Sequence, residues 1–232
     1  MLKYEKIALK IEEEIKSKNL QQGTKLPSIE ELMSKYEVSK STIVKSLSTL
    51  ENRGIIFQVR GSGIFVRRKT RDGYVNLVLH NGLTKGLENL ELSTKLIYLK
   101  KIIPDAEIAS NLNCLEGEEV YAVKRIRYSD NQVMCLEEAY YKKSLVPYLN
   151  NEIASNSIFY YIETALGVKI SFSDKYLTVD KLNEDNAFDL ELPVGEPVIC
   201  IDELYYTTTG ETLNFSRVTY HYKHAKFFIQ TM

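Results

Sequence analysis

Two arginines stand at a spacing that suits the binding of a small anion, and two glutamates stand where one of them could pair with those arginines instead. Arg125 and Arg127 alternate within one strand pattern, so both side chains point to the same face of a sheet. Two guanidinium groups on one face repel each other unless an anion or a carboxylate lies between them, and guanidinium geometry suits phosphate. The partner strand of the hairpin carries Glu137 and Glu138, one of which faces the arginines. An anion site and a cross-strand ion pair are therefore both open interpretations.

The other reactive residue types show no catalytic or metal-binding spacing. His80, His221 and His224 lie in no known nucleophile or metalloprotease motif, and neither a Walker loop nor a G-x-G-x-x-G fingerprint occurs. The three cysteines are isolated and lack C-x-x-C spacing, which disfavours a zinc site or a disulfide framework. We therefore expect no cofactor, no metal ion and no enzymatic activity.

Charge is divided unevenly along the chain. The 232 residues carry a net charge of -1, but residues 1–71 hold 15 Lys+Arg against 8 Asp+Glu, a net of +7, and the rest holds 15 against 23, a net of -8. A basic first third on an acidic body indicates a module that binds a polyanion, joined to a second function. The N-terminus has no apolar signal region, and no apolar run approaches the roughly 18 residues of a membrane span, so we expect a cytoplasmic protein without a membrane partner.

Three helices and a hairpin are predicted in residues 1–68. Residues 3–18 have apolar side chains at helical spacing, Ser28 begins a capping-box pattern with Glu31, and Ser39 precedes a third helix. Two short strands then flank Arg60-Gly61-Ser62. This order is typical of a winged helix-turn-helix, whose third helix enters the major groove of DNA.

The residues expected to contact DNA lie at the start of the third helix and in the wing. Hydroxyl and cationic side chains suit phosphate and base-edge contacts, and glycines let the wing turn approach the duplex. With the capping serine of the second helix, the set is Ser28, Ser39, Lys40, Ser41, Thr42, Lys45, Arg60, Gly61 and Gly63.

In the rest of the chain, alternating apolar and polar residues predict a sheet with a few short helices. Residues 69–76 are predicted to form a polar linker. Within residues 77–232, strands are predicted at 94–103, 119–128, 133–141, 169–180, 198–208 and 211–222, and helices after Pro104 and at 158–166 and 184–190. Recurring hairpins indicate a mainly antiparallel α+β domain.

Both parts resemble one known family. Residues 1–68, through LPSIEEL, Tyr36-Glu37-Val38-Ser39 and Gly61-Ser62-Gly63-Ile64-Phe65-Val66, resemble the DNA-binding domain of GntR-type bacterial transcription regulators. Residues 83–230 resemble the UTRA effector domain of the HutC branch, which has the chorismate-lyase-like fold. The matching motifs are Lys124-Arg125-Ile126-Arg127-Tyr128, Leu136-Glu137-Glu138-Ala139-Tyr140 and Phe215-Ser216-Arg217-Val218-Thr219-Tyr220.

The resemblance implies a homodimer, more often a repressor, that binds double-stranded operator DNA and responds to a small anionic effector such as a sugar phosphate. By resemblance, Thr84, Arg125, Arg127 and Ser157 surround the anionic group of the effector. Glu137, Asn214 and Tyr220 surround the rest of the ligand. Two alternatives stay open: a lyase-like enzyme fused to a DNA-binding module, and a DNA binder that ignores ligands.

The chain departs from the family pattern at four positions. Glu30 and Val44 stand where the family commonly has arginine, which weakens the general attraction to phosphate, and Lys40 replaces another arginine without its planar fork. Asn214 stands where sugar-phosphate members commonly have glutamate, which keeps an acceptor but removes a charge. The resemblance therefore fixes neither the operator sequence nor the sugar.

Overall fold

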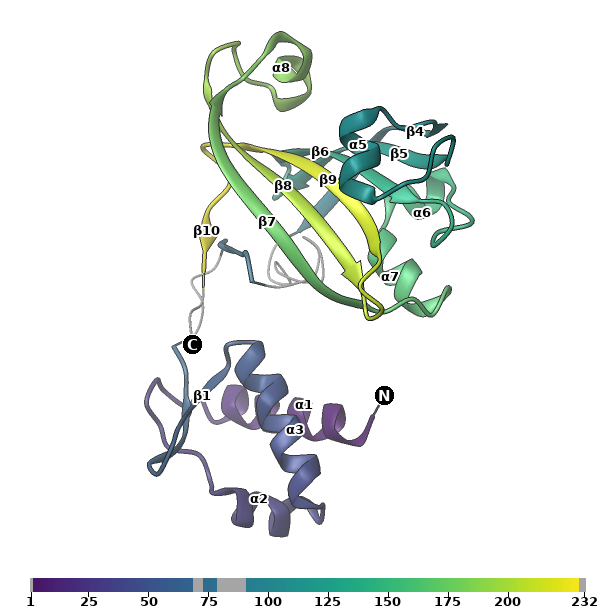
Figure 1. The fold of residues 1–232 in the computed structure, drawn as a ribbon. Helices are drawn as coiled ribbons and strands as arrows, with labels where there is room; N and C mark the ends of the chain where they lie inside the picture. Colours follow the sequence, from purple (N-terminus) through teal and green to yellow (C-terminus); the bar gives the residue numbers. More distant parts are fainter. Residues whose placement is uncertain (1, 69–72, 79–90, 230–232) are drawn as a thin grey trace. The chain divides into compact units, whose positions relative to one another are not determined.

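The structure, a computed structural model, describes residues 2–68, 73–78 and 91–229. The chain divides into two compact units, Met1–Arg71 and Asp72–Met232 (Figure 1). Among the residues described, no helix is both long enough and apolar enough to cross a membrane.

Three helices build the first unit: α1 (Lys3–Ser17), α2 (Ile29–Tyr36) and α3 (Lys40–Asn52). Both predicted caps are present, because Ser28 and Ser39 each accept a hydrogen bond from the backbone N–H three residues later. The apolar stripe of α3 is fully buried, with Ile43, Leu47 and Leu50 each 0% exposed. This stripe packs into one core with the apolar faces of α1 and of the following strands.

Polar side chains also fix α1 against the other two helices. The Ser46 hydroxyl on α3 lies 2.8 Å from the carbonyl oxygen of Tyr4. On α1, the Glu14 carboxylate accepts hydrogen bonds from Lys35 and from the Tyr36 hydroxyl. These bonds, led by that from Lys35, lower the pKa of Glu14 to about 2. The pair α2–α3 is therefore attached to α1 by hydrogen bonds as well as by apolar packing.

A two-stranded wing follows α3. Strand β1 (Ile56–Val59) pairs antiparallel with β2 (Gly63–Val66). Gly61 in the connecting turn has φ +78°, a conformation that residues with a Cβ rarely adopt. The three helices and the wing confirm the winged helix-turn-helix expected from the sequence.

The second unit contains a six-stranded sheet in the order β4-β5-β6-β9-β8-β7, in which all neighbouring strands are antiparallel. Its strands are β4 (Leu92–Ile102), β5 (Val120–Ser129), β6 (Gln132–Lys142), β7 (Ile170–Lys181), β8 (Pro197–Thr207) and β9 (Thr212–His221). Asp130 and Asn131, both with positive φ, make the two-residue turn between β5 and β6. The mainly antiparallel α+β architecture is thereby confirmed.

Short helices cover both faces of this sheet. Those described are α5 (Ala106–Leu112), α6 (Asn151–Ser155), α7 (Ile158–Thr164) and α8 (Glu184–Leu190). On one face, α5 packs against Phe215 and α8 against Leu136. On the other face, α6 and α7 pack against Tyr141. One face of the sheet is therefore covered by α5 and α8, and the other by α6 and α7.

A separate parallel pair joins two distant segments of the second unit: β3 (Val75–Asn76) and β10 (Phe227–Phe228). Val75 and Asn76 fall in the segment expected to be a linker, yet they form a strand. Their partner lies near the other end of the chain, so no local pattern could indicate the pairing. The sequence gives no sign of α6 either, because its five residues are too few to show a helical period.

Candidate functional site

The residues of α3 expected to contact DNA gather at its N-terminal end. The Ser39 hydroxyl lies 3.0 Å from both the Ser41 and the Thr42 hydroxyl groups. Lys40, Ser41 and Lys45 are exposed, and Thr42 is half-buried. This end of α3 therefore presents hydroxyl and ammonium groups, which are donors suited to phosphate oxygens and base edges.

Ser28 and the wing residues lie elsewhere on the surface of the same unit. Ser28 is exposed in front of α2, and Arg60 and Gly61 are exposed at the turn of the wing. Gly63 is half-buried, and a Cβ at this position would lie 2.7 Å from the Cε of Lys25. Glycine therefore lets β2 run close to the Lys25 side chain, and the contacts of all these residues with DNA stay a prediction.

The second unit holds a cluster of buried charges on the face that α6 and α7 cover. Arg125 and Arg127 on β5 are 4% and 5% exposed. Nη2 of Arg125 donates to both carboxylate oxygens of Glu137 on β6, at 2.7 and 2.8 Å. Nη1 of Arg127 lies 3.7 Å from Oε2 of the same carboxylate. The glutamate that faces the arginines is thus Glu137, the direct register partner of Arg125, and the cross-strand ion pair is present.

The second terminal nitrogen of the Arg125 guanidinium donates hydrogen bonds to the backbone. This nitrogen, Nη1, donates to the carbonyl oxygens of Ala154 and Asn156, at 3.0 and 3.1 Å. These carbonyls end α6, where the last turn of a helix lacks internal partners. Ser157 follows directly, and its hydroxyl accepts from the N–H of Tyr160 to cap α7. Arg125 therefore supports the chain beside Ser157 as well as pairing with the carboxylate.

The two arginines differ in their electrostatics. Burial disfavours the charge of Arg125, but Glu137 outweighs that effect and raises the pKa of Arg125. Burial, followed by the neighbouring Arg125, lowers the pKa of Arg127. Burial alone would raise the pKa of Glu137, yet the two guanidinium groups hold it below its ordinary value. The Glu137 carboxylate therefore stays negatively charged between the two guanidinium groups although it is buried.

Sequence reasoning missed a second charged pair on this face. The Glu203 carboxylate on β8 accepts a hydrogen bond from the Tyr205 hydroxyl at 2.9 Å, and it lies 3.1 Å from Nζ of Lys175 on β7. Strand pairing through β9 puts Glu203 on the same face as Glu137. Alternation along a strand shows which residues share a face of that strand. Only the order of strands in the sheet shows that Glu203 lies on the same face as Glu137.

The other residues expected to bind the effector are distributed around the cluster. Asn214 is 1% exposed, and its amide donates to the carbonyl oxygen of Tyr140 at 2.9 Å. Tyr220 is also 1% exposed, and its ring packs edge-on against Phe227 with centroids 4.7 Å apart. Both share the face of the arginine cluster. Thr84 lies outside the described residues.

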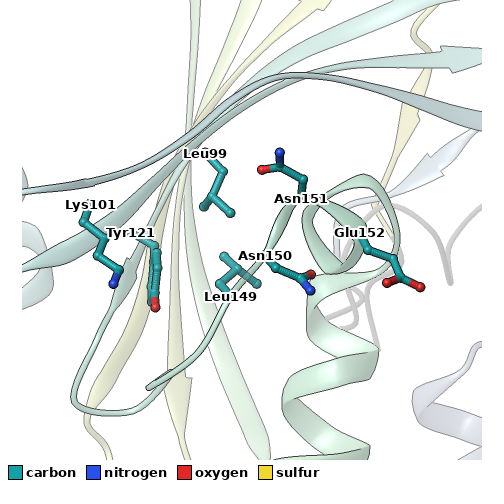
Figure 2. Close-up of a pocket in the computed structure, with 7 residues that line it drawn as sticks. All are labelled: Leu99, Lys101, Tyr121, Leu149, Asn150, Asn151 and Glu152. Atoms are coloured by element: carbon teal, nitrogen blue, oxygen red, sulfur yellow. The ribbon is translucent and has the colours of Figure 1, made fainter.

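A separate groove of about 520 Å³ lies where α6 begins beside β4 and β5. Figure 2 shows its lining residues: Leu99, Lys101, Tyr121, Leu149, Asn150, Asn151 and Glu152. None of the expected effector-binding residues that the structure describes lines it. The groove is therefore distinct from the arginine cluster, and its one cation is accompanied by one carboxylate.

A winged helix-turn-helix joined to a sheet domain with a buried cationic cluster defines a class of protein, the DNA-binding regulators that carry a ligand-binding domain. Residues 3–66 match the model of bacterial regulatory proteins of the gntR family, and residues 87–226 match that of the UTRA domain. The chain belongs to the GntR family of transcription regulators and carries a UTRA domain. It combines a DNA-binding helix-turn-helix with an effector-binding domain, and its relatives are named transcription regulators.

Relatives agree with this assignment. YydK of Bacillus subtilis (strain 168), an uncharacterized HTH-type transcriptional regulator, is 50% identical over 99% of this chain and 98% of its own length. Its crystal structure matches with a TM-score of 0.88 at 49% identity and covers 100% of both chains. The HTH-type transcriptional repressor NagR of the same organism is 25% identical over 94% of this chain and 89% of NagR. MngR of Escherichia coli (strain K12), the mannosyl-D-glycerate transport/metabolism system repressor, is 23% identical over 97% and 93%.

Proposed function

We propose that this chain is a cytoplasmic, homodimeric repressor that releases its operator when a small anion of the sugar-phosphate class binds to the second unit. In this proposal, residues 1–68 bind DNA and residues 77–232 bind the effector, and the segment 69–76 joins them, with its last two residues paired as β3 in the second unit. The observation that carries it is the buried cluster in which Arg125 and Arg127 share the carboxylate of Glu137. Two relatives, NagR and MngR, are named repressors, and the name of MngR includes a glycosylated acid.

The chemistry of the cluster favours an anion with several oxygens. A second anion beside Arg127 would restore the stability of its positive charge, which burial and Arg125 reduce. A phosphate can accept paired hydrogen bonds from planar guanidinium groups. If phosphate takes the place of the Glu137 carboxylate, that carboxylate becomes an acceptor for sugar hydroxyl groups. Glu137 thus acts as an internal anion in the ligand-free state and as a sugar-binding group in the bound state.

Release of DNA follows if the effector favours a different arrangement of the two DNA-binding units. In a dimer, the two α3 helices reach successive half-sites about 34 Å apart. The effector can lower operator occupancy only by its differential affinity for the two arrangements. Dimerisation is therefore part of the proposal, and sedimentation of the free protein at micromolar concentration tests it separately.

The test measures operator affinity with and without candidate effectors. A labelled operator selected from random duplex DNA is titrated with the full-length protein, in the presence of hexose phosphates, amino-sugar phosphates, the matching unphosphorylated sugars or inorganic phosphate. We expect one sugar phosphate to weaken binding at least tenfold, while its unphosphorylated form leaves binding unchanged. Equal operator affinity across the whole panel would contradict ligand control.

Two arginine variants localise the response. Arg127→Gln removes a guanidinium from the cluster and is expected to abolish the effector response while leaving ligand-free DNA binding intact. Arg217→Gln is the matched control, because Arg217 pairs with Asp202 and Glu107 on the opposite face of the same sheet. If both variants lose the response, or both keep it, the arginine cluster is not the effector site.

One observation favours a second candidate, a DNA binder that ignores ligands. Arg125 already donates to two carbonyl groups and to both oxygens of Glu137, so the protein itself satisfies much of its donor capacity. In a protein without an effector, these internal hydrogen bonds would be enough to account for the buried Arg125. Thermal unfolding in each candidate effector decides between the two, because a ligand bound only by the native state raises the unfolding temperature.

A further inference from the structure

Val44 is an apolar residue on the polar, exposed side of α3. Its side chain is 45% exposed, whereas Ile43 and Leu47 in the adjacent buried stripe are 0% exposed. Its neighbours one turn before and after, Lys40 and Ser48, are exposed. Val44 therefore lies on the outer surface of the helix rather than in the core.

Helix formation does not account for valine at this position. Valine is a weaker helix former than alanine or lysine, because its branched Cβ restricts the side chain against the preceding turn. Nearly half of its surface stays in water, so packing within the unit recovers only part of that cost. A contact outside this chain would recover the remainder.

The position of Val44 on α3 indicates the chemistry of that contact. In a winged helix-turn-helix, the N-terminal half of this helix faces the base edges in the major groove. Lys40, Ser41 and Lys45 around it can donate hydrogen bonds, but the side chain of Val44 can only make apolar contacts. The apolar group that base pairs present in the major groove is the C5-methyl group of thymine.

We infer that Val44 is a specificity-determining residue that contacts the C5-methyl group of a thymine in each operator half-site. This inference rests on the proposed DNA-binding role of α3 and deepens it by assigning one base. The polar neighbours of Val44 position α3 on the sugar-phosphate backbone of the DNA, and Val44 discriminates thymine from a pyrimidine that lacks the methyl group.

The experiment changes only that methyl group. Sequences bound by the full-length protein are first selected from random duplex DNA. Each thymine of the selected sequence is then replaced, one at a time, by deoxyuridine, and affinity is measured by fluorescence anisotropy at fixed salt. At one thymine in a half-site we expect affinity of the unaltered protein to fall about threefold to fivefold, the effect of losing one buried methyl group.

Two variants separate this contact from a general effect on binding. Val44→Ala is expected to bind the thymine and deoxyuridine duplexes equally at that position. Lys45→Ala should weaken binding to both duplexes and keep their ratio. The inference is overturned if Val44→Ala keeps the full preference for thymine, or if no thymine shows a methyl effect with the unaltered protein. If selection enriches no sequence at all, the DNA-reading role of α3 fails, and this inference fails with it.

Discussion

Replacing Glu137 with glutamine removes the carboxylate that two buried guanidinium groups share. The change keeps the shape of the side chain but leaves Arg125 and Arg127, which are 4% and 5% exposed, without that negative charge. Breaking a buried ion pair by removing one partner typically costs about 3–5 kcal/mol. At a urea dependence of about 2 kcal/mol per M, the unfolding midpoint of the second unit should fall by roughly 2 M.

Tyrosine fluorescence is a suitable probe for this unfolding transition. The chain has no tryptophan, and of its 16 tyrosines only Tyr4 and Tyr36 precede residue 72, so the signal reports mainly on the second unit. Phosphate supplies a second readout. If the cluster admits an anion, phosphate should stabilise Glu137→Gln more than it stabilises the unaltered protein, compared with chloride at equal ionic strength.

Glu138→Gln is the matched control for the charge change. Glu138 is the next residue on β6, faces the other way, and pairs with Lys124 at 3.4 Å with 29% of its side chain exposed. Its loss should cost less than about 1 kcal/mol. The reasoning is refuted if Glu137→Gln costs no more than Glu138→Gln, because the shared carboxylate would then contribute nothing to the buried cluster.

Three further predictions concern other parts of the chain. Arg60→Ala should weaken DNA binding for all sequences and reduce the slope of log affinity against log salt by about 1, measured by salt titration; an unchanged slope would remove the wing from the interface. Leu47→Ala should destabilise the first unit by about 2–5 kcal/mol, because Leu47 is 0% exposed, and hydrogen exchange in α1–α3 would show the loss. Burial and then His224, stacked 4.0 Å away, lower the pKa of His221, so the unfolded chain takes up this proton first as pH falls. Stability should therefore decline below a pH of about 6.5, and His221→Gln should flatten that decline in urea titrations at several pH values.

Local signals in the sequence were sufficient for the winged unit. The caps at Ser28 and Ser39 depend on residues three positions away, and the buried stripe of α3 depends on one helical period. These two features need no knowledge of distant contacts. The face of Glu137 was less predictable, because the turn alone does not set the register of that hairpin: a register shift between Arg127 and Tyr128 decides that Glu137, rather than Glu138, shares the face of Arg125.

Features that depend on distant segments could not be predicted. The bonds from Arg125 to the end of α6 join residues about thirty positions apart, and α6 itself is too short to show a pattern. The neighbourhood of Glu203 depends on β9 lying between β6 and β8. Pairing between β3 and β10 likewise joins segments from the two ends of the second unit. Tertiary packing decides each of these, and no local periodicity encodes them.

The hydrogen bonds of Arg125 have a mechanical consequence. Its guanidinium is a rigid plane, with one nitrogen on Glu137 and the other on the carbonyls of Ala154 and Asn156. Tilting this plane to loosen the first contact must also lengthen the other two. The corner between α6 and α7 therefore shifts when the guanidinium itself turns away from Glu137, and amide protons near that corner should exchange faster with solvent deuterium whenever it does.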